Sequence, residues 1–405
     1  MSRSTRSWWR VAAVVVALAV VAGACGSKDD NKNTNAGGGG GGGGNKKTIA
    51  FAFAGPETGP NAALGLNIVK GAKVALQEAN ASSDKYHFVL KPFDTQGDSA
   101  QITTVKDKFI NDASVLGLIG PTFSGETKAV IQDLQTANLP MISASATNAA
   151  LPTVIPNETV FHRLIPDDDV QGAGVTDFVL KVLKAKTAAY VNDNSDYGKG
   201  LADGTQALLE KAGVHTVATD VIDPKAEAYS AAVTKVKDAH PDIIFYGGYY
   251  AEAGKFKKQL TDEGVTAKFV SGDGSLDLGF VRSAGASGAE GAWLTCPCRL
   301  ATPDAGGKLG KFATDYKKVN KADAGTYSTQ GYDAAKIFVQ GVLAGNTTRQ
   351  QLLTYVEGLK TYDGVAGVIE LQDNGNVTNK DVYVYKVESG KLTEVGTVAN
   401  AIAKG

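Results

Sequence analysis

The sequence has few histidines, which removes several kinds of chemistry. Histidine occurs four times in 405 residues, and no two lie at a catalytic or metal-ligand spacing. The four positions are His87, His162, His215 and His240. The G-x-S-x-G motif of many hydrolases is also absent. The sequence therefore favours a protein that is not an enzyme and that uses no metal and no cofactor.

The chain also lacks an excess of either charge. Its 41 lysines and arginines nearly balance its 42 aspartates and glutamates, which gives a formal net charge of -1. No basic stripe stands out, so nucleic acid is not expected as a partner. Hydrophobic residues make up 43% of the chain, an ordinary globular composition with enough length for two domains.

The first 24 residues have the pattern of a signal peptide. A start with arginines at positions 3, 6 and 10 precedes an unbroken run of apolar and small residues over 11–24. This run is too short to span a bilayer comfortably, and it ends in Ala22-Gly23-Ala24-Cys25, which resembles a bacterial lipobox. We expect residues 1–24 to be removed and a diacylglyceryl Cys25 to anchor the protein on the outer face of the cytoplasmic membrane. The alternative is an ordinary signal peptide with a chance cysteine.

Residues 25–47 predict a disordered tether behind this anchor. Polar residues are followed by an unbroken glycine run over 37–44. Such a segment cannot bury enough apolar surface to offset the entropy lost on ordering. We therefore expect it to hold a folded body away from the membrane.

From residue 48 onward, strand and helix patterns alternate. Strands are predicted at 49–54, 88–93, 115–120, 140–145, 187–193, 214–221, 242–248, 268–271, 382–387 and 392–398. Helices are predicted at 61–80, 99–112, 125–137, 170–183, 197–212, 229–238, 251–263, 308–320, 326–344 and 349–359. This order predicts an α/β fold of two Rossmann-like lobes, each a mostly parallel sheet flanked by helices, with ligands at the carboxyl ends of the strands.

One strand end, LIGPTFSGETK at 118–128, comes close to a nucleotide-binding loop. Gly120 and Gly125 have the right spacing, but Glu126 stands where the phosphate-binding loop needs lysine. A glutamate repels a polyphosphate, whereas Ser124, at a predicted helix N-cap, suits a small anion.

The other lobe offers groups for a cation. Asp273 follows a predicted strand, and Tyr197 and Tyr249 supply aromatic walls that tolerate a positive charge. An anion site facing a cation site predicts a zwitterion such as an α-amino acid. Each residue also has an ordinary explanation: a helix cap for Ser124, a turn former for Asp273, and core or surface aromatics for the tyrosines.

Six stretches in order resemble the periplasmic leucine/isoleucine/valine-binding proteins, which are the solute-binding components of branched-chain amino acid ABC importers. The resemblance covers nearly the whole body, from residue 47 to about residue 387. The stretches are TGP, LIGPTFSGET, MISASATNAAL, YVNDNSDYGKG, IFYGGYYAEAG and VSGDGS.

The resemblance implies a role for each matching residue. Ser124 corresponds to the carboxylate-binding hydroxyl and N–H, and Ser145 and Thr147 to groups that contact carboxylate and ammonium. Tyr197 and Tyr249 correspond to the tyrosines that close over the ligand. Asp273 takes the place of the acid that pairs with the ammonium, which is typically a glutamate in the family. Leu64 stands where an aromatic often lines the side-chain pocket, and Phe123 stands beside Ser124, so the side-chain preference departs from the family pattern.

The resemblance also implies a hinged clamp of the type I periplasmic binding fold, a Venus flytrap. We expect lobe 1 to comprise 48–165 plus 295–372 and lobe 2 to comprise 166–294 plus 373–405. The three crossovers of the hinge are expected near Pro166, residues 293–295 and Asp373. The implied partners are a free amino acid, aliphatic or branched-chain first, and the permease subunits of an ABC importer, with the binding protein as a monomer.

Other functions remain open at this stage. A ligand-sensing receptor module needs the same clamp, other small amino acids or amides fit the same grip, and an amide hydrolase needs a nucleophile–base pair that the sequence does not supply. Cys296 and Cys298 either form a local disulfide, which suits a protein outside the cytoplasm, or stay reduced.

Overall fold

The computed structural model describes residues 46–404. The predicted signal peptide, Cys25 and nearly all of the predicted tether lie outside these residues. Among residues 46–404, no helix combines the length and the apolar character that crossing a membrane requires.

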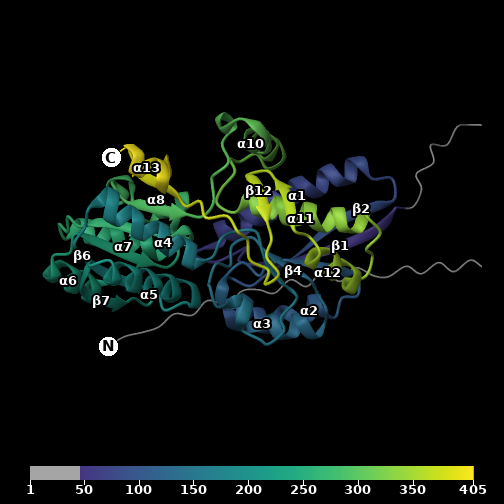
Figure 1. Ribbon diagram of the computed structural model, residues 1–405, viewed down its shortest axis with the longest axis horizontal. Helices are drawn as coiled ribbons and strands as arrows, with labels where there is room; N and C mark the ends of the chain where they lie inside the picture. Colours follow the sequence, from purple (N-terminus) through teal and green to yellow (C-terminus); the bar gives the residue numbers. More distant parts are fainter. Residues whose placement is uncertain (1–45, 405) are drawn as a thin grey trace, which may run out of the picture. The chain divides into compact units, whose positions relative to one another are not determined.

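The first half of the fold is built on five parallel strands in the order β2-β1-β3-β4-β5. The strands are β1 (Lys47–Gly55), β2 (Tyr86–Asp94), β3 (Val115–Ile119), β4 (Met141–Ser143) and β5 (Phe161–Arg163). The helices are α1 (Ala62–Ser82), α2 (Ser99–Ile110), α3 (Ser124–Thr136) and, from later in the chain, α10 (Gly307–Asn320), α11 (Ser328–Leu343) and α12 (Arg349–Glu357). Helix α11 packs along α1, so two distant segments of the chain share this half (Figure 1).

The second half is built on seven strands in the order β14-β13-β10-β9-β8-β6-β7. They are β6 (Thr187–Asn192), β7 (His215–Val221), β8 (Ile243–Gly247), β9 (Lys268–Ser271), β10 (Trp293–Cys296), β13 (Tyr383–Glu388) and β14 (Lys391–Thr397). Strand β13 runs antiparallel to both neighbours, and the pairs from β10 to β7 are parallel. The helices are α4 (Asp168–Phe178), α5 (Asp196–Lys211), α6 (Ser230–Ala239), α7 (Tyr250–Asp262), α8 (Leu278–Ala284), α9 (Ala286–Ala289) and α13 (Val398–Lys404).

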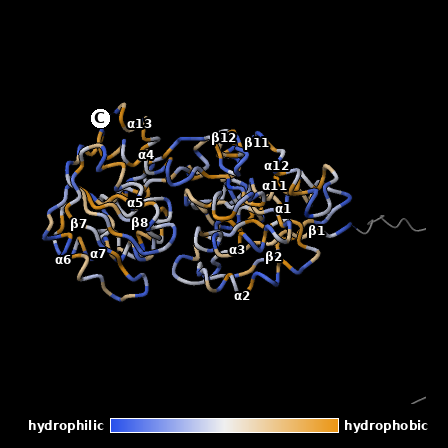
Figure 2. The backbone as a smooth tube through the Cα atoms, turned by 60° about the horizontal axis from the view of Figure 1, so that its bottom comes forward, coloured by the Kyte–Doolittle hydropathy of each residue, from blue (hydrophilic) through white to orange (hydrophobic). Residues whose placement is uncertain are grey.

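The predicted α/β class with parallel sheets is confirmed, and the two halves repeat one strand order. In each, the strand that comes first along the chain lies between the second and the third. Such a sheet has its switch point beside that first strand, between β1 and β3 in one half and between β6 and β8 in the other. In folds of this kind, ligands bind outside the carboxyl ends of the strands that flank the switch point. In Figure 2, hydrophobic residues lie in the interior of both halves.

The sequence patterns did not predict several short strands. Strands β5 and β10 and the hairpin of β11 (Thr361–Gly364) and β12 (Gly367–Glu370) have three or four residues each, too few to show a period. Strand β10 spans residues 293–295, where a crossover was expected. The chain therefore leaves the second sheet only after Cys296, which forms a disulfide with Cys298.

Candidate functional site

Loops from both halves bring the predicted site residues together. Seven of the eight follow β3 and β4 in the first half or β6, β8 and β9 in the second, and Leu64 lies in α1, after β1. Seven of the eight side chains are buried, namely Leu64, Phe123, Ser124, Ser145, Thr147, Tyr197 and Asp273, and Tyr249 is partly exposed. Sequence reasoning thus found one cluster drawn from two sheets.

Asp273 is the centre of a hydrogen-bond network that joins the two halves. Its side chain is 0% exposed. The Tyr197 hydroxyl donates to Oδ1 at 2.7 Å, and the Tyr327 hydroxyl, from the first half, donates to Oδ2 at 2.7 Å. The Gly274 N–H donates to the Tyr197 oxygen at 2.9 Å. Both carboxylate oxygens are therefore held in fixed positions.

Aromatic rings from opposite halves pack directly against each other. The Phe123 and Tyr249 rings are stacked with centroids 4.1 Å apart, and Tyr197 lies 5.2 Å from Tyr249 on the same side of the cluster. Each of Phe123 and Tyr249 is the residue just before a helix, α3 and α7 respectively. The apolar wall of the site is thus formed where the two helix N-termini face each other.

The prediction that Ser124 is an N-cap is wrong. Phe123 occupies the N-cap position, and the Glu126 side chain reaches back to accept its N–H at 2.8 Å. The Ser124 oxygen instead accepts the Asn148 N–H at 3.2 Å. The Ser124 hydroxyl accepts this bond and donates none within residues 46–404, so the hydroxyl proton can be donated to an anion at the start of α3.

Gly120 shapes the loop that presents this helix N-terminus. Its φ is +117°, and a Cβ atom on it would lie 2.5 Å from the Ala54 carbonyl oxygen. Only glycine adopts this conformation without strain and without a clash. The glycine spacing in the sequence thus reflects backbone geometry.

Ser145 and Thr147 present different groups to the site. The Ser145 hydroxyl donates to the Thr122 carbonyl at 2.6 Å, so the side chain already has a structural partner. The Thr147 hydroxyl is buried and has no hydrogen-bond partner within residues 46–404. Thr147 therefore offers a side-chain group, whereas Ser145 offers its backbone.

Leu64 lies in α1 and is 0% exposed. It belongs to the same hydrophobic cluster as Phe123 and Ile68. It is thus a core residue of the first half.

Sequence reasoning missed three polar residues of this cluster: Asp168, Gln171 and Tyr327. Asp168 and Gln171 lie one turn apart in α4, and Tyr327 directly precedes α11. A usable signal was present in Asp168-x-x-Gln171, since residues three apart share one face of a helix.

Direct bonds between the halves surround the cluster. Asn61, which precedes α1, donates to Glu252 Oε2 at 3.2 Å and accepts the Ala251 N–H at 3.1 Å. On another edge, Lys128 of α3 pairs with Asp196 of α5 at 2.6 Å. These contacts directly link segments that belong to different sheets.

Buried carboxyl groups dominate the electrostatics of the site. Burial raises the pKa of Asp273, Asp168 and Asp193 above their ordinary values. Burial likewise raises the pKa of Glu126 to about 7, and burial together with the charge of Asp193 raises that of Glu252 to about 8. An apolar medium disfavours such charges unless a cation is close. The site is therefore acidic at the Asp273 end and suits a positively charged group.

Within residues 46–404, no group of three or more histidine, cysteine or acidic side chains is arranged to hold a metal ion. Burial lowers the pKa of His162 to about 4, so this histidine is neutral within the core.

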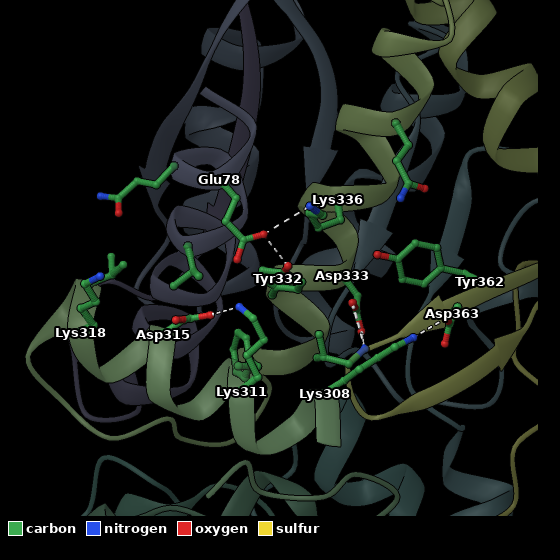
Figure 3. A pocket seen from close by; sticks show the side chains of 16 residues that line it. Glu78, Lys308, Lys311, Asp315, Lys318, Tyr332, Asp333, Lys336, Tyr362 and Asp363 are labelled. Atoms are coloured by element: carbon green, nitrogen blue, oxygen red, sulfur yellow. Dashed lines mark hydrogen bonds and ion pairs between the residues drawn. The ribbon is translucent and has the colours of Figure 1, made fainter. Parts of the chain in front are cut away.

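The pocket in Figure 3 is separate from this cluster. It is a cavity of about 660 Å³ between α1, α10, α11 and the β11 hairpin strand. Its charged side chains are largely paired with one another: Glu78 binds Lys336 and the Tyr332 hydroxyl, Lys311 binds Asp315, and Lys308 binds Asp363. None of the predicted site residues lines it.

Comparisons with known proteins converge on one group. A sequence profile described as periplasmic binding protein matches residues 48–391. A Leu/Ile/Val-binding protein of Rhizobium johnstonii is 28% identical over 349 residues, which cover 85% of this chain and 93% of that protein. The branched-chain amino acid transporter substrate binding protein of Streptococcus pneumoniae, solved with isoleucine, is 26% identical with a TM-score of 0.78, covering 86% of this chain and all of that one.

A more distant solved structure has the same fold with another ligand. A solute binding protein of R. palustris in complex with benzoate is 18% identical, with a TM-score of 0.77 over 87% of this chain and 96% of that one. At this identity the likeness concerns the fold alone.

Proposed function

Because the chain belongs to the periplasmic binding protein family, we propose that it is an extracytoplasmic solute-binding protein of an ABC importer. It binds a free amino acid between its two halves. The observation that carries this proposal is the pairing of a helix N-terminus at Ser124 with a buried carboxylate at Asp273. One end of the cleft suits an anion and the other a cation.

The two ends select a zwitterion over a simple acid. The ligand carboxylate meets the N–H groups at the start of α3 and the Ser124 hydroxyl. The ligand ammonium meets Asp273, held by Tyr197 and Tyr327. A ligand with a carboxylate alone, such as benzoate, would leave the buried Asp273 carboxylate without a counter-ion, which is costly.

Binding then works through closure of two lobes. Lobe 1 is the first half, 48–165 with the segment that runs from β10 to about residue 372, and lobe 2 is the remainder. The ligand first docks on lobe 1 through Ser124, Ser145 and Thr147, and closure brings Tyr197, Tyr249 and Asp273 over it. The ligand drives closure because it contacts both lobes only in the closed form, which the permease then recognises.

Aliphatic and branched-chain amino acids are the first ligand class. The Rhizobium and Streptococcus relatives named for such ligands support it, as does the apolar wall of the stacked Phe123 and Tyr249 rings. Other small amino acids or amides are the next candidates, because Leu64 and Asp273 depart from the family pattern. Recognition of the ligand's carboxylate and ammonium does not depend on which side chain the ligand carries.

A ligand screen tests the proposal. Thermal unfolding of purified residues 46–405 is measured with each of the common free amino acids and with the matching carboxylic acids and amines. A true ligand at about 100 times its Kd stabilises the protein by about 2.7 kcal/mol. A screen in which no amino acid shifts the unfolding transition would refute amino acid binding.

Membrane attachment through Cys25 is part of the same proposal and rests on the lipobox-like sequence alone. The full chain expressed in bacteria should fractionate with membranes, and Cys25→Ser should move it to the soluble fraction. Equal membrane association of both forms would contradict a lipid anchor.

A further inference from the structure

Asp168 is a buried carboxylate whose oxygens make no close hydrogen bond within residues 46–404. It is the first residue of α4, its side chain is 7% exposed, and neither oxygen has a hydrogen-bond partner within residues 46–404. The N-cap function of α4 belongs to Asp167, whose side chain accepts the Val170 N–H. The nearby Thr147 hydroxyl and the Arg163 charge favour its ionised form, but burial outweighs both and raises the pKa of Asp168. A cationic donor from a ligand would therefore stabilise this carboxylate.

Two further unpaired acceptors lie in the same cluster. The Thr147 hydroxyl and the Gln171 Oε1 are buried and have no partner in the described residues. The Asp168 N–H donates to the Thr147 carbonyl at 2.9 Å, which ties the start of α4 to the Thr147 loop. A buried carboxylate, a hydroxyl and an amide oxygen thus remain available to a ligand's N–H groups.

These acceptors face Asp273. After burial, the charge of Asp273 is the largest cause of the raised pKa of Asp168. A Cβ atom on Gly272, the residue before Asp273, would lie 2.7 Å from the Tyr197 hydroxyl and 3.2 Å from Gln171 Oε1. Asp273 already accepts hydrogen bonds from two tyrosine hydroxyls. Asp168 therefore has more oxygen lone pairs left to accept hydrogen bonds from a ligand.

We propose that Asp168 is a second carboxylate for the ligand's cationic end, and that Asp168, Asp273 and Thr147 together select a primary ammonium. This inference rests on the proposed function of amino acid binding. A primary ammonium donates three N–H bonds, one to each of these residues. N-methylation removes one N–H donor and leaves one of these buried acceptors without a hydrogen bond. Sites built from buried polar groups strongly reject an analogue that lacks one of the expected hydrogen bonds.

The test compares L-leucine with N-methyl-L-leucine, and L-alanine with N-methyl-L-alanine, by calorimetry on the purified protein. The wild type should prefer each parent amino acid at least tenfold. Asp168→Asn should weaken parent binding at least tenfold and reduce the preference over the N-methyl form. Asp169→Asn is the matched control, because it removes the same charge from the next, exposed position of α4; its affinities should stay within about twofold of wild type.

A second readout separates ligand contact from a structural role. Removing an unpaired buried charge should leave the unliganded thermal midpoint of Asp168→Asn at or above that of the wild type, whereas loss of a structural ion pair would lower it. Equal wild-type affinity for leucine and its N-methyl form, or unchanged binding by Asp168→Asn, overturns the inference while amino acid binding stands. A wild type that binds no amino acid defeats the proposed function itself.

Discussion

Asp273→Asn is expected to weaken amino acid binding at least 100-fold. The substitution keeps the shape of the side chain but removes the charge at the centre of the Tyr197–Asp273–Tyr327 network. The ligand ammonium would then lose its held counter-ion in a site with no exposure to water. Breaking a buried pair in this way typically costs about 3–5 kcal/mol, and each 1.4 kcal/mol is tenfold in affinity.

Calorimetry with the best amino acid of the screen measures this loss. Asp304→Asn serves as the control, because Asp304 is exposed and its substitution removes the same charge. The control should bind like the wild type. If Asp273→Asn binds as tightly as the control, the ammonium lies elsewhere and the assigned cation site is wrong.

Arg163→Met is expected to cost about 3–5 kcal/mol in the free energy of unfolding. The guanidinium is 0% exposed, and it donates to the carbonyls of Ala146 and Asn148 and to Asn376 Oδ1 at 2.9–3.1 Å. It also faces the Asp167 carboxylate at 3.4 Å. Methionine fills similar space but leaves all of these acceptors without their donor, and buried acceptors left unpaired are costly.

Urea unfolding followed by circular dichroism measures the change. Arg299→Met is the matched control, because Arg299 is partly exposed and pairs with Glu394 near the surface. That pair is worth about 1 kcal/mol or less. Similar losses in both variants would contradict the view that Arg163 fastens the Thr147 loop to α4 and to the segment around Asn376.

The clustering of the candidate site residues could be predicted from the sequence where a residue follows a strand. Ser124, Thr147, Tyr197, Tyr249 and Asp273 all lie just after predicted strands, and parallel strands bring their carboxyl ends to one edge of a sheet. Sheet topology therefore decides which of these loops become neighbours. Hydrophobic periodicity was enough to find most of the strands and helices, because they are long enough to show a period.

The site residues that could not be predicted depend on how the two halves of the fold pack against each other. Asp168 and Tyr327 lie at the starts of helices that follow passages between the sheets, and Tyr327 reaches Asp273 only because the halves are in contact. No local sequence pattern predicts the contact between Tyr327 of one half and Asp273 of the other. The Ser124 cap was mispredicted for a similar reason, since a serine before a helix is the usual cap and only the structure places Glu126 on the Phe123 N–H.

The most direct test of the account is whether one ligand needs both of its charges. For the best amino acid of the screen, calorimetry compares it with the amine that lacks its carboxylate and with the acid that lacks its ammonium. If Ser124 binds the carboxylate and Asp273 binds the ammonium, each analogue should bind at least 100-fold more weakly than the amino acid. An acid that binds as tightly as the amino acid would contradict the account, because the buried carboxylates at Asp273 and Asp168 would then have no cation to hold.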